Sequence, residues 1–362
     1  MLPPCPHFGT CGGCTLQHWG EPAYLAWKAG LLTEALQRAG YAEPPIMPIV
    51  RSAPAERRRM DLAVRRTPQG SVTVGFHQRR TEQVVDILTC PVLNPALVAL
   101  LPELRRVLRS LGALKRAGSA VVNLLDSGPD LLLRTDSPLS AADRTRLAGF
   151  AQAHGLPRIS WALGDGAPET ACLLRPATTR IAGIEVTPPP GAFLQATPGG
   201  EAAIAVAMLA GLPAGLPARA RIADLFAGSG TLTFALAARG RVAAFEGDAA
   251  ASGALTAAAR KAGLAGRIEA ETRDLARRPL MPAELSRFAA VVLDPPFAGA
   301  APQIAQIAAA KCRRVIYVSC NPAALTRDAR TLRGAGFNLL AATPIDQFLW
   351  SARLESVAVF TA

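Results

Sequence analysis

The sequence RIADLFAGSGT at residues 221–231 is the strongest indication of how this chain folds. Apolar residues over 221–226 predict a buried strand, and residues 231–239 predict the helix that follows it. The glycines between them let the backbone approach a ligand closely, while the start of the helix offers unpaired N–H groups. The stretch therefore predicts a nucleotide-type binding turn in an α/β domain.

A carboxylate at the end of the next predicted strand strengthens this interpretation. Glu246 ends the strand 242–246 and lies 22 positions after Asp224, a spacing that suits a carboxylate reaching a ribose diol. A complete GxGxxG is absent, which argues against a dinucleotide, and Asp294-Pro295-Pro296 follows a later strand. The combination favours S-adenosylmethionine as the ligand. The alternative is a tight turn beside a solvent-exposed acid.

Helices and strands alternate after a Pro-rich linker at 187–191, as is typical of a parallel sheet. The further elements predicted there are helices at 198–210 and 249–262, strands at 289–294 and 314–319, and two runs at 337–344 and 353–360 that could pair antiparallel. Before the linker, a helix at 21–40 precedes short alternating strands from about 45 to 190, with another helix near 92–112. We therefore expect more than one domain.

A cysteine follows the predicted strand 314–319 and precedes Asn321-Pro322. There, Cys320 would lie at the carboxyl edge of the sheet, where open α/β folds bind their ligands. A thiolate is an effective nucleophile, so we predict a catalytic role for Cys320. Glu355, in the last predicted strand, is the candidate base, with a structural role equally open. The remaining isolated cysteines, Cys172 and Cys312, are expected to be buried packing residues.

Three cysteines near the N-terminus, Cys5, Cys11 and Cys14, have the spacing C-x5-C-x2-C, and Cys90-Pro91 offers a distant fourth thiol. Three thiolates in a Gly-rich loop and one on a separate segment can enclose an iron–sulfur cluster. A zinc ion accepts the same four ligands. Both interpretations stay open on spacing alone.

The charge of the chain favours a polyanionic partner. Its 362 residues include 39 Lys and Arg against 27 Asp and Glu, a net charge of +12. Between Arg51 and Arg116, thirteen basic residues meet five acidic ones, which suits an RNA backbone; an ordinary solvated surface is the alternative. No secretory pattern or membrane span is recognisable, so we expect a cytoplasmic protein away from membranes, with reduced cysteines.

Several motifs in order resemble the uracil-C5 RNA methyltransferases, particularly the bacterial 23S rRNA members that carry an iron–sulfur cluster. The resemblance spans nearly the whole chain. It rests on CPHFGTCGGC at 5–14, ERRRMDLAV at 56–64, VGFHQRR at 74–80, Thr89-Cys90-Pro91, Phe193-Leu194-Gln195, DLFAGSGT at 224–231, Glu246, Asp274, Asp294-Pro295-Pro296, SCNP at 319–322, Asp346-Gln347-Phe348 and Leu354-Glu355.

The resemblance implies a role for each matching residue. Those expected to ligate a [4Fe–4S] cluster are Cys5, Cys11, Cys14 and Cys90. Those expected to contact S-adenosylmethionine are Gln195, Phe226, Thr231, Glu246, Asp274 and Asp294. Cys320 falls at the nucleophile and Glu355 at the proton acceptor. The thiolate would add to uracil C6, C5 would take the methyl group, Glu355 would remove the C5 proton, and the thiol would leave. The target base must leave its stack to react.

The expected fold is α/β: a class I, Rossmann-like methyltransferase domain at 191–362 with a smaller α+β part before it. That part would comprise the cluster loop at 1–20, a linking helix at 21–40 and a central RNA-binding domain at 41–190, which Cys90 joins to the loop. The expected substrate is 23S rRNA and the expected state is a monomer. Relatives often begin with an RNA-binding β-barrel, whereas this sequence begins at the cysteine loop, so RNA affinity is expected to rest on the central domain.

Two further departures from the family pattern bear on function. Phe297 follows Asp294-Pro295-Pro296 where the family usually has Arg, and Arg353 replaces a His before the base region. Asp-Pro-Pro-Phe resembles methyltransferases of exocyclic amines, which need no cysteine. The alternatives are therefore such an amine methyltransferase, a tRNA uracil-C5 methyltransferase, or a non-catalytic RNA-binding iron–sulfur protein.

Overall fold

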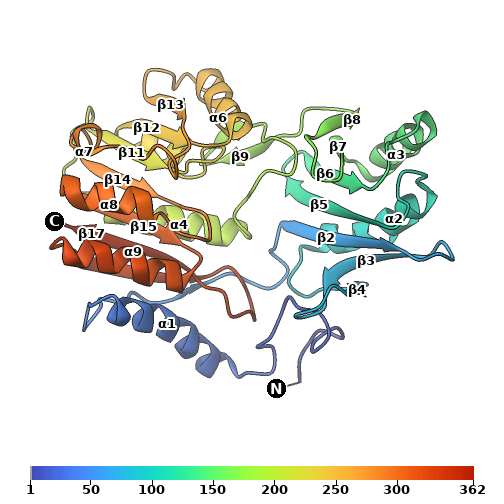
Figure 1. The fold of residues 1–362 in the computed structure, drawn as a ribbon, viewed down its shortest axis with the longest axis horizontal. Helices are drawn as coiled ribbons and strands as arrows, with labels where there is room; N and C mark the ends of the chain where they lie inside the picture. Colours follow the sequence, from blue (N-terminus) through green and yellow to red (C-terminus); the bar gives the residue numbers. More distant parts are fainter. Residues whose placement is uncertain (1) are drawn as a thin grey trace.

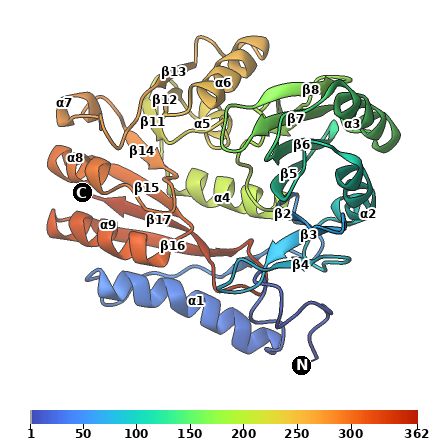
Figure 2. The ribbon, with the colours of Figure 1, turned by 45° about the vertical axis from the view of Figure 1, so that its right-hand side comes forward.

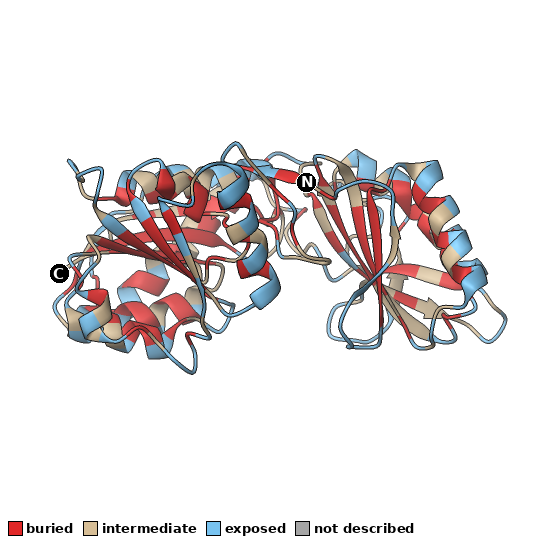
Figure 3. Cartoon of the chain, turned by 90° about the horizontal axis from the view of Figure 1, so that it is seen from above, coloured by how far each residue is buried: buried red, intermediate tan, exposed pale blue. Residues whose placement is uncertain are grey.

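The computed structural model describes residues 2–362, which form two lobes (Figure 1). The C-terminal lobe is built on an eight-stranded sheet and the central lobe on a seven-stranded sheet. Helix α1 (Glu21–Arg38) runs beside α9 (Pro322–Gly334) below the large sheet in both views (Figure 2). Buried residues form separate cores in the two lobes (Figure 3).

The large sheet has the strand order β1-β16-β17-β15-β14-β11-β12-β13. Its strands are β1 (Val50–Arg51), β11 (Arg221–Leu225), β12 (Arg241–Glu246), β13 (Ile268–Thr272), β14 (Ala290–Leu293), β15 (Arg314–Ser319), β16 (Asn338–Asp346) and β17 (Glu355–Thr361). Strands β11 to β15 are mutually parallel, whereas β17 pairs antiparallel with β15 and β16. The predicted parallel sheet and the terminal antiparallel pair are both confirmed.

Helices cover both faces of this sheet, which is why its central strands are apolar throughout. One face packs against α4 (Pro198–Gly211), α5 (Thr233–Ala237) and α6 (Ala249–Lys261). The other packs against α1, α7 (Pro282–Leu285), α8 (Ala301–Ala310) and α9. The helix predicted over 231–239 is much shorter than expected, because the turn continues through Leu232 before the first α-helical residue, Thr233.

The central lobe places α2 (Pro95–Ser110) and α3 (Ala141–His154) on one face of its sheet. Asn94 caps α2 through Ala96 N–H, and Ser140 with Asp143 forms a capping box on α3. The sheet order is β4-β3-β2-β5-β6-β7-β8. The strands are β2 (Arg59–Arg66), β3 (Val72–His77), β4 (Val84–Asp86), β5 (Ala117–Leu125), β6 (Gly128–Thr135), β7 (Arg158–Leu163) and β8 (Glu169–Leu173).

Two short segments before residue 190 belong to the C-terminal core. The hairpin of β9 (Thr179–Ile181) and β10 (Ile184–Val186) buries Ile181 and Val186 among the side chains of that core. Strand β1 pairs with β16 in the large sheet. The chain therefore crosses between the lobes more than once.

Polar contacts fasten the lobes together beside residues 191–197. Arg58 donates to the Gln195 carbonyl (3.1 Å) and pairs with Glu201. Arg59 and Asn123 both donate to the Ala192 carbonyl, each at a distance of 2.9 Å. This segment therefore lies against both lobes. No helix among residues 2–362 is long and apolar enough to cross a membrane.

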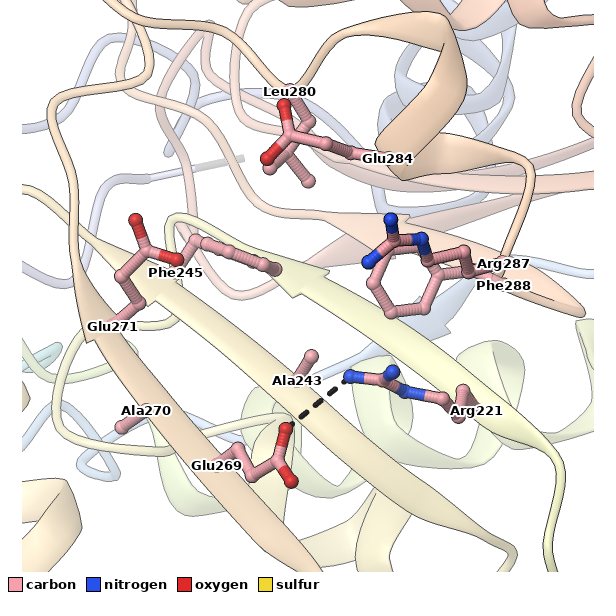
Figure 4. A pocket seen from close by; sticks show the side chains of 10 residues that line it. All are labelled: Arg221, Ala243, Phe245, Glu269, Ala270, Glu271, Leu280, Glu284, Arg287 and Phe288. Atoms are coloured by element: carbon pink, nitrogen blue, oxygen red, sulfur yellow. Dashed lines mark hydrogen bonds and ion pairs between the residues drawn. The ribbon is translucent and has the colours of Figure 1, made fainter.

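A hollow on the large sheet lies away from the predicted site residues (Figure 4). It has a volume of about 330 Å³ and lies where the four-residue helix α7 leaves part of the sheet face uncovered. It is lined by the ion pair of Arg221 with Glu269 (3.2 Å) and by the rings of Phe245 and Phe288. Its charged groups are thus partly satisfied by one another.

Candidate active site

The predicted site residues gather at the carboxyl edge of the large sheet. The strand order reverses between β11 and β14, and such a reversal opens a crevice at that edge. Phe226 follows β11, Asp294 follows β14, Cys320 follows β15 and Glu246 ends β12. Parallel strands thus bring together residues that are up to 94 positions apart, from Phe226 to Cys320.

The turn after β11 has a backbone that few side chains tolerate. Phe226 adopts φ +63°, and Gly228 and Gly230 also have positive φ. A Cβ on Gly230 would lie 2.4 Å from the Phe234 ring, so this position requires glycine. A Cβ on Gly228 would meet nothing within 4 Å, so that part of the turn is open. A strained turn held at a sheet edge is common at binding sites.

Glu246 organises this turn from the neighbouring strand. One carboxylate oxygen accepts the Gly228 N–H at 2.8 Å and the other accepts the Asp248 N–H at 2.7 Å. The Asp274 Cα lies 3.7 Å from where a Cβ on Gly247 would be. Asp274 itself is exposed and caps the following turn through Ala276 N–H at 3.0 Å. The structure therefore brings Glu246 and Asp274 to the same edge.

Asp224 is a buried acid beneath the turn. One of its oxygens accepts the Thr233 hydroxyl at 2.5 Å, while the other has no partner in the part of the chain that the structure describes. Burial raises the pKa of Asp224 to about 7; the Thr233 hydrogen bond opposes the shift, and the charges of Asp294 and Glu246 add to it. The neighbouring Thr231 is half-buried within the turn.

This shift predicts a pH-dependent stability. The folded state binds the Asp224 proton more tightly than the unfolded state, so the group favours folding at low pH, and its contribution is lost as the pH rises to about 7. We expect Asp224→Asn, which still accepts the Thr233 bond, to lose less stability than the wild type between about pH 4 and 8. Urea midpoints across that range measure this. Parallel losses in both proteins would contradict the shift.

Cys320 and Glu355 lie opposite each other at the sheet edge. Strands β15 and β17 pair Ser319 with Ser356, and continuing this antiparallel register by one residue places Cys320 across from Glu355. Cys320 is half-buried, whereas Glu355 is only 3% exposed. Burial raises the pKa of Cys320 to about 11, with the charges of Glu355 and Asp294 contributing and Arg353 acting in the opposite direction.

A chain of amides connects two acids of this site, the buried Glu355 and the half-buried Asp294. The Gln347 side-chain N–H group donates to Glu355 (2.8 Å) and to the Gln195 side-chain oxygen (2.7 Å). Gln195 in turn donates to Asp294 at 3.0 Å. Burial, and then the charge of Asp294, raises the pKa of Glu355 well above its ordinary value. One Glu355 oxygen, Oε1, has no partner among the described residues.

A buried lysine that the sequence analysis missed holds the segment before Glu355. Lys28 Nζ lies 2.7 Å from Asp346 and also donates to the carbonyls of Phe348 and Arg353. The other Asp346 oxygen accepts the Tyr24 hydroxyl at 2.5 Å. The residues Tyr24, Lys28 and Leu32 follow at intervals of four along α1, so a lysine in the apolar stripe was the available signal.

We expect Lys28→Met to destabilise the protein by about 3–5 kcal/mol, because the charge of Asp346 would remain buried without its partner. Urea unfolding at pH 7 measures the change. Adding Asp346→Asn to Lys28→Met is the control: it removes the stranded charge and should restore part of the stability. An unchanged midpoint for Lys28→Met would contradict the role assigned to the pair.

The four predicted cluster cysteines line one cavity of about 550 Å³ between the N-terminal loop and the central lobe. Backbone pairing of Cys11 with Gln78 fixes the loop, and the backbone N–H groups of Thr15 and Leu16 donate to the Trp350 carbonyl. Burial raises the pKa of Cys14 to about 11, and it also raises the pKa values of Cys11 and Cys90. Among residues 2–362, no group of three or more Cys, His, Asp or Glu side chains is arranged to hold a metal ion.

The other cysteines lie elsewhere. Cys312 is buried as expected, whereas Cys172 is only partly buried, because β8 is the edge strand of the central sheet.

Residues 212–320, which include the glycine-rich turn and Cys320, match a family described as Conserved hypothetical protein 95.

Relatives match nearly the whole chain in sequence, and a solved structure matches it in fold. An uncharacterized RNA methyltransferase of Caulobacter vibrioides is 41% identical, over 100% of this chain and 86% of its own length. The 23S rRNA (uracil(1939)-C(5))-methyltransferase RlmD of Nitrosospira multiformis is 34% identical, over 99% of this chain and 84% of its own length. The solved structure of Pyrococcus abyssi tRNA (uracil-54, C5)-methyltransferase, in complex with S-adenosyl-L-homocysteine, has a TM-score of 0.71 at 20% identity. The match covers 98% of this chain and 86% of the solved one.

The strand order and the crevice at its reversal define a Rossmann-like α/β fold, the fold that the solved Pyrococcus abyssi structure shares. The identity and coverage of the relatives go further. The chain belongs to the family of RNA methyltransferases that includes the Caulobacter and Nitrosospira proteins.

Proposed function

We propose that this RNA methyltransferase transfers a methyl group from S-adenosylmethionine to C5 of a uridine in 23S rRNA. The observation that carries the proposal is the position of Cys320 across from Glu355, at the edge where the glycine-rich turn opens. A nucleophile next to a buried acid at one sheet edge suits addition to C6 and proton removal from C5. The 34% identity to RlmD of Nitrosospira multiformis supports the choice of substrate.

In this mechanism Cys320 acts first and last. Once the thiol of Cys320 has lost its proton to solvent, the thiolate adds to uracil C6, and the electron pair of the C5–C6 bond moves toward C5. C5 then becomes nucleophilic enough to take the methyl group, and the donor would leave as S-adenosylhomocysteine. Glu355 then accepts the C5 proton. The electrons of the C–H bond restore the double bond, and the Cys320 sulfur leaves C6. Burial and the charge of Asp294 raise the pKa of Glu355, and a more basic carboxylate is a stronger proton acceptor.

The residues at the sheet edge fit the proposed cofactor. S-adenosylmethionine, when bound, supplies the methyl group as a sulfonium. The open turn at Gly228 leaves room for a ligand, and Glu246 is held there by two backbone N–H groups. The acids Asp294 and Glu355 would favour a cationic ligand. We propose contacts from Gln195, Phe226, Thr231, Glu246, Asp274 and Asp294. Since one chain supplies all these groups, a monomer suffices.

We propose that Cys5, Cys11, Cys14 and Cys90 hold a [4Fe–4S] cluster. The support is that all four thiols line one cavity of about 550 Å³, larger than a single ion requires. Cys90 and Cys5 also raise the pKa of Cys14 by the repulsion between nearby thiolates, which bound iron would relieve. Because the loop hydrogen-bonds the segment before Glu355, we assign the cluster a structural role.

We expect Cys14→Ser to lose most of the iron and sulfide of anaerobically purified protein, together with its broad visible absorption. Cys172→Ser is the matched control, because that thiol lies on β8, outside the cavity, and it should keep both. Elemental analysis and absorption spectra measure the outcome. Stoichiometric zinc without sulfide in the wild-type protein would show that these cysteines bind zinc and not an iron–sulfur cluster.

Unmodified 23S rRNA and tRNA transcripts, incubated with the protein and isotope-labelled S-adenosylmethionine, test the proposed reaction. Nucleoside mass spectrometry should find labelled 5-methyluridine in 23S rRNA. Label in 5-methyluridine of tRNA alone would change the substrate. Labelled N-methyl nucleosides would favour the second candidate, an exocyclic-amine methyltransferase. The observation that favours this candidate is the exposed ring of Phe297, 56% accessible directly after Asp294-Pro295-Pro296. RNA binding without any transfer would leave a non-catalytic RNA-binding protein.

A further inference from the structure

An arginine at the mouth of the active site carries a charge that no protein group neutralises. The Arg353 guanidinium lies 5.4 Å from the centre of the Phe297 ring, in a cation–π contact. It is exposed, and it makes no hydrogen bond or ion pair with any residue that the structure describes. Stacking on an aromatic ring fixes a guanidinium while leaving its N–H edges free to bind an anion.

Both partners of this stack are anchored to the catalytic segments. The Phe297 carbonyl accepts the Asn321 side-chain N–H at 2.8 Å, one residue after Cys320. Arg353 lies two residues before Glu355. Its backbone carbonyl accepts from Lys28, and its backbone N–H donates to the Ser351 hydroxyl at 3.2 Å. The stack therefore joins the segment that carries the nucleophile to the segment that carries the base.

A second guanidinium faces the same opening. Arg57 and Arg353 line one cavity; burial lowers the pKa of Arg57, the charges of Cys90 and Cys14 oppose this, and the charges of Arg59 and Arg353 add to it. Arg57 donates to the Arg59 carbonyl at 3.0 Å and pairs with no carboxylate among residues 2–362. Arg57 therefore adds a second positive charge to the cavity that Arg353 lines, and Arg353 is the one that keeps its guanidinium exposed.

We propose that Arg353, stacked on Phe297, binds a backbone phosphate of the RNA beside the nucleotide that enters the site, with Arg57 as the second cation. This inference rests on the RNA substrate of the proposed function but not on the position that is methylated. The nearby acids do not compete for the guanidinium, because Glu355 is buried and both Glu355 and the half-buried Asp294 accept hydrogen bonds from amide side chains. A phosphate held there would set the register of the strand at Cys320.

Salt-dependent RNA binding tests this proposal without any methyl transfer. The probe is a fluorescein-labelled 20-nucleotide oligouridylate, titrated with anaerobically purified protein at several salt concentrations. Compared with the wild type, Arg353→Gln should bind about tenfold more weakly and reduce the slope of log K against log salt by about one. Phe297→Leu, which keeps the charge but removes the stack, should fall between the two.

Arg239→Gln is the matched control. It removes the same charge at the opposite edge of the sheet, just before β12, and should leave the slope unchanged. If Arg353→Gln behaves like Arg239→Gln, or if the wild type does not bind the probe, the proposal is wrong. A reduced slope with no 5-methyluridine formed on any transcript would retain the phosphate site and overturn the proposed function instead.

A pH series of alkylation separates this role from activation of the thiol. Iodoacetamide labelling of Cys320, followed by peptide mass spectrometry, reports its thiolate. The charged groups that act on Cys320 are Glu355, Asp294 and Arg353. If the role of Arg353 is to bind the RNA phosphate, Arg353→Gln should change the titration of Cys320 little in the absence of RNA. A large upward shift in Arg353→Gln with an unchanged salt slope would make Arg353 a partner of the thiolate and overturn the phosphate site.

Discussion

We expect Cys320→Ala to slow methyl transfer by a factor of at least about 10⁴ and to retain the binding of S-adenosylmethionine and RNA. Without the sulfur, uracil C5 never becomes nucleophilic, and no other described thiol lines this edge of the sheet. Alanine leaves β15 and its pairing with β17 intact, because the register is made by the backbone. Single-turnover transfer to 23S rRNA measures the loss.

Cys312→Ala and Cys172→Ala provide the comparison for this substitution. Both remove a thiol outside the site, so transfer should stay within a few-fold of the wild type. Wild-type rates in Cys320→Ala would exclude covalent catalysis and favour methylation of an amine beside Phe297. Loss of S-adenosylmethionine binding in Cys320→Ala would show that the substitution disturbs the cofactor site, and the rate would then say nothing about a nucleophile.

Glu355→Gln should lower turnover by about 10²- to 10⁴-fold, the range of general-base catalysis. The expected signature is an accumulation of methylated RNA joined to the protein, because the Cys320 sulfur cannot leave C6 until the C5 proton is removed. Glutamine matches the shape of Glu355, and its side-chain oxygen can still accept from Gln347. Denaturing gels with labelled S-adenosylmethionine measure the trapped species.

Gln347→Leu is the useful companion to this variant. It removes the amide that connects Glu355 with Gln195 and keeps the base, so turnover should fall while the adduct does not accumulate. A Glu355→Gln protein that loses transfer without forming any adduct would contradict the assigned step. In that case Glu355 would act before the methyl group is transferred.

The sequence predicted much of the fold because the sheet is regular. Apolar runs at 242–246 and 314–319 became β12 and β15 with bounds within one residue. The central domain predicted over 41–190 wrongly included residues 179–186, because their apolar side chains would suit either core and contacts with α6 place them in the C-terminal one. The length of α5 depended equally on local geometry, because the turn around Gly230 extends into it.

The site was predictable where single strands define it and was missed where distant segments meet. Cys320 and Glu246 end predicted strands, so the carboxyl edge followed from the pattern. The partners of Asp346 are Lys28 and Tyr24, more than 300 positions away in the chain. The Phe297–Arg353 stack equally depends on the pairing of β17 beside β15. Such contacts carry no local periodicity.

RNA containing 5-fluorouridine tests the central claim most directly. Fluorine at C5 cannot be removed as a proton by Glu355, so the reaction should stop with the RNA joined to Cys320 and methylated. Incubation with S-adenosylmethionine should therefore give a complex that survives denaturation, is absent in Cys320→Ala, and maps to the Cys320 peptide by mass spectrometry. Methyl transfer to uridine-containing RNA with no such complex on the fluorinated RNA would contradict covalent catalysis at this site.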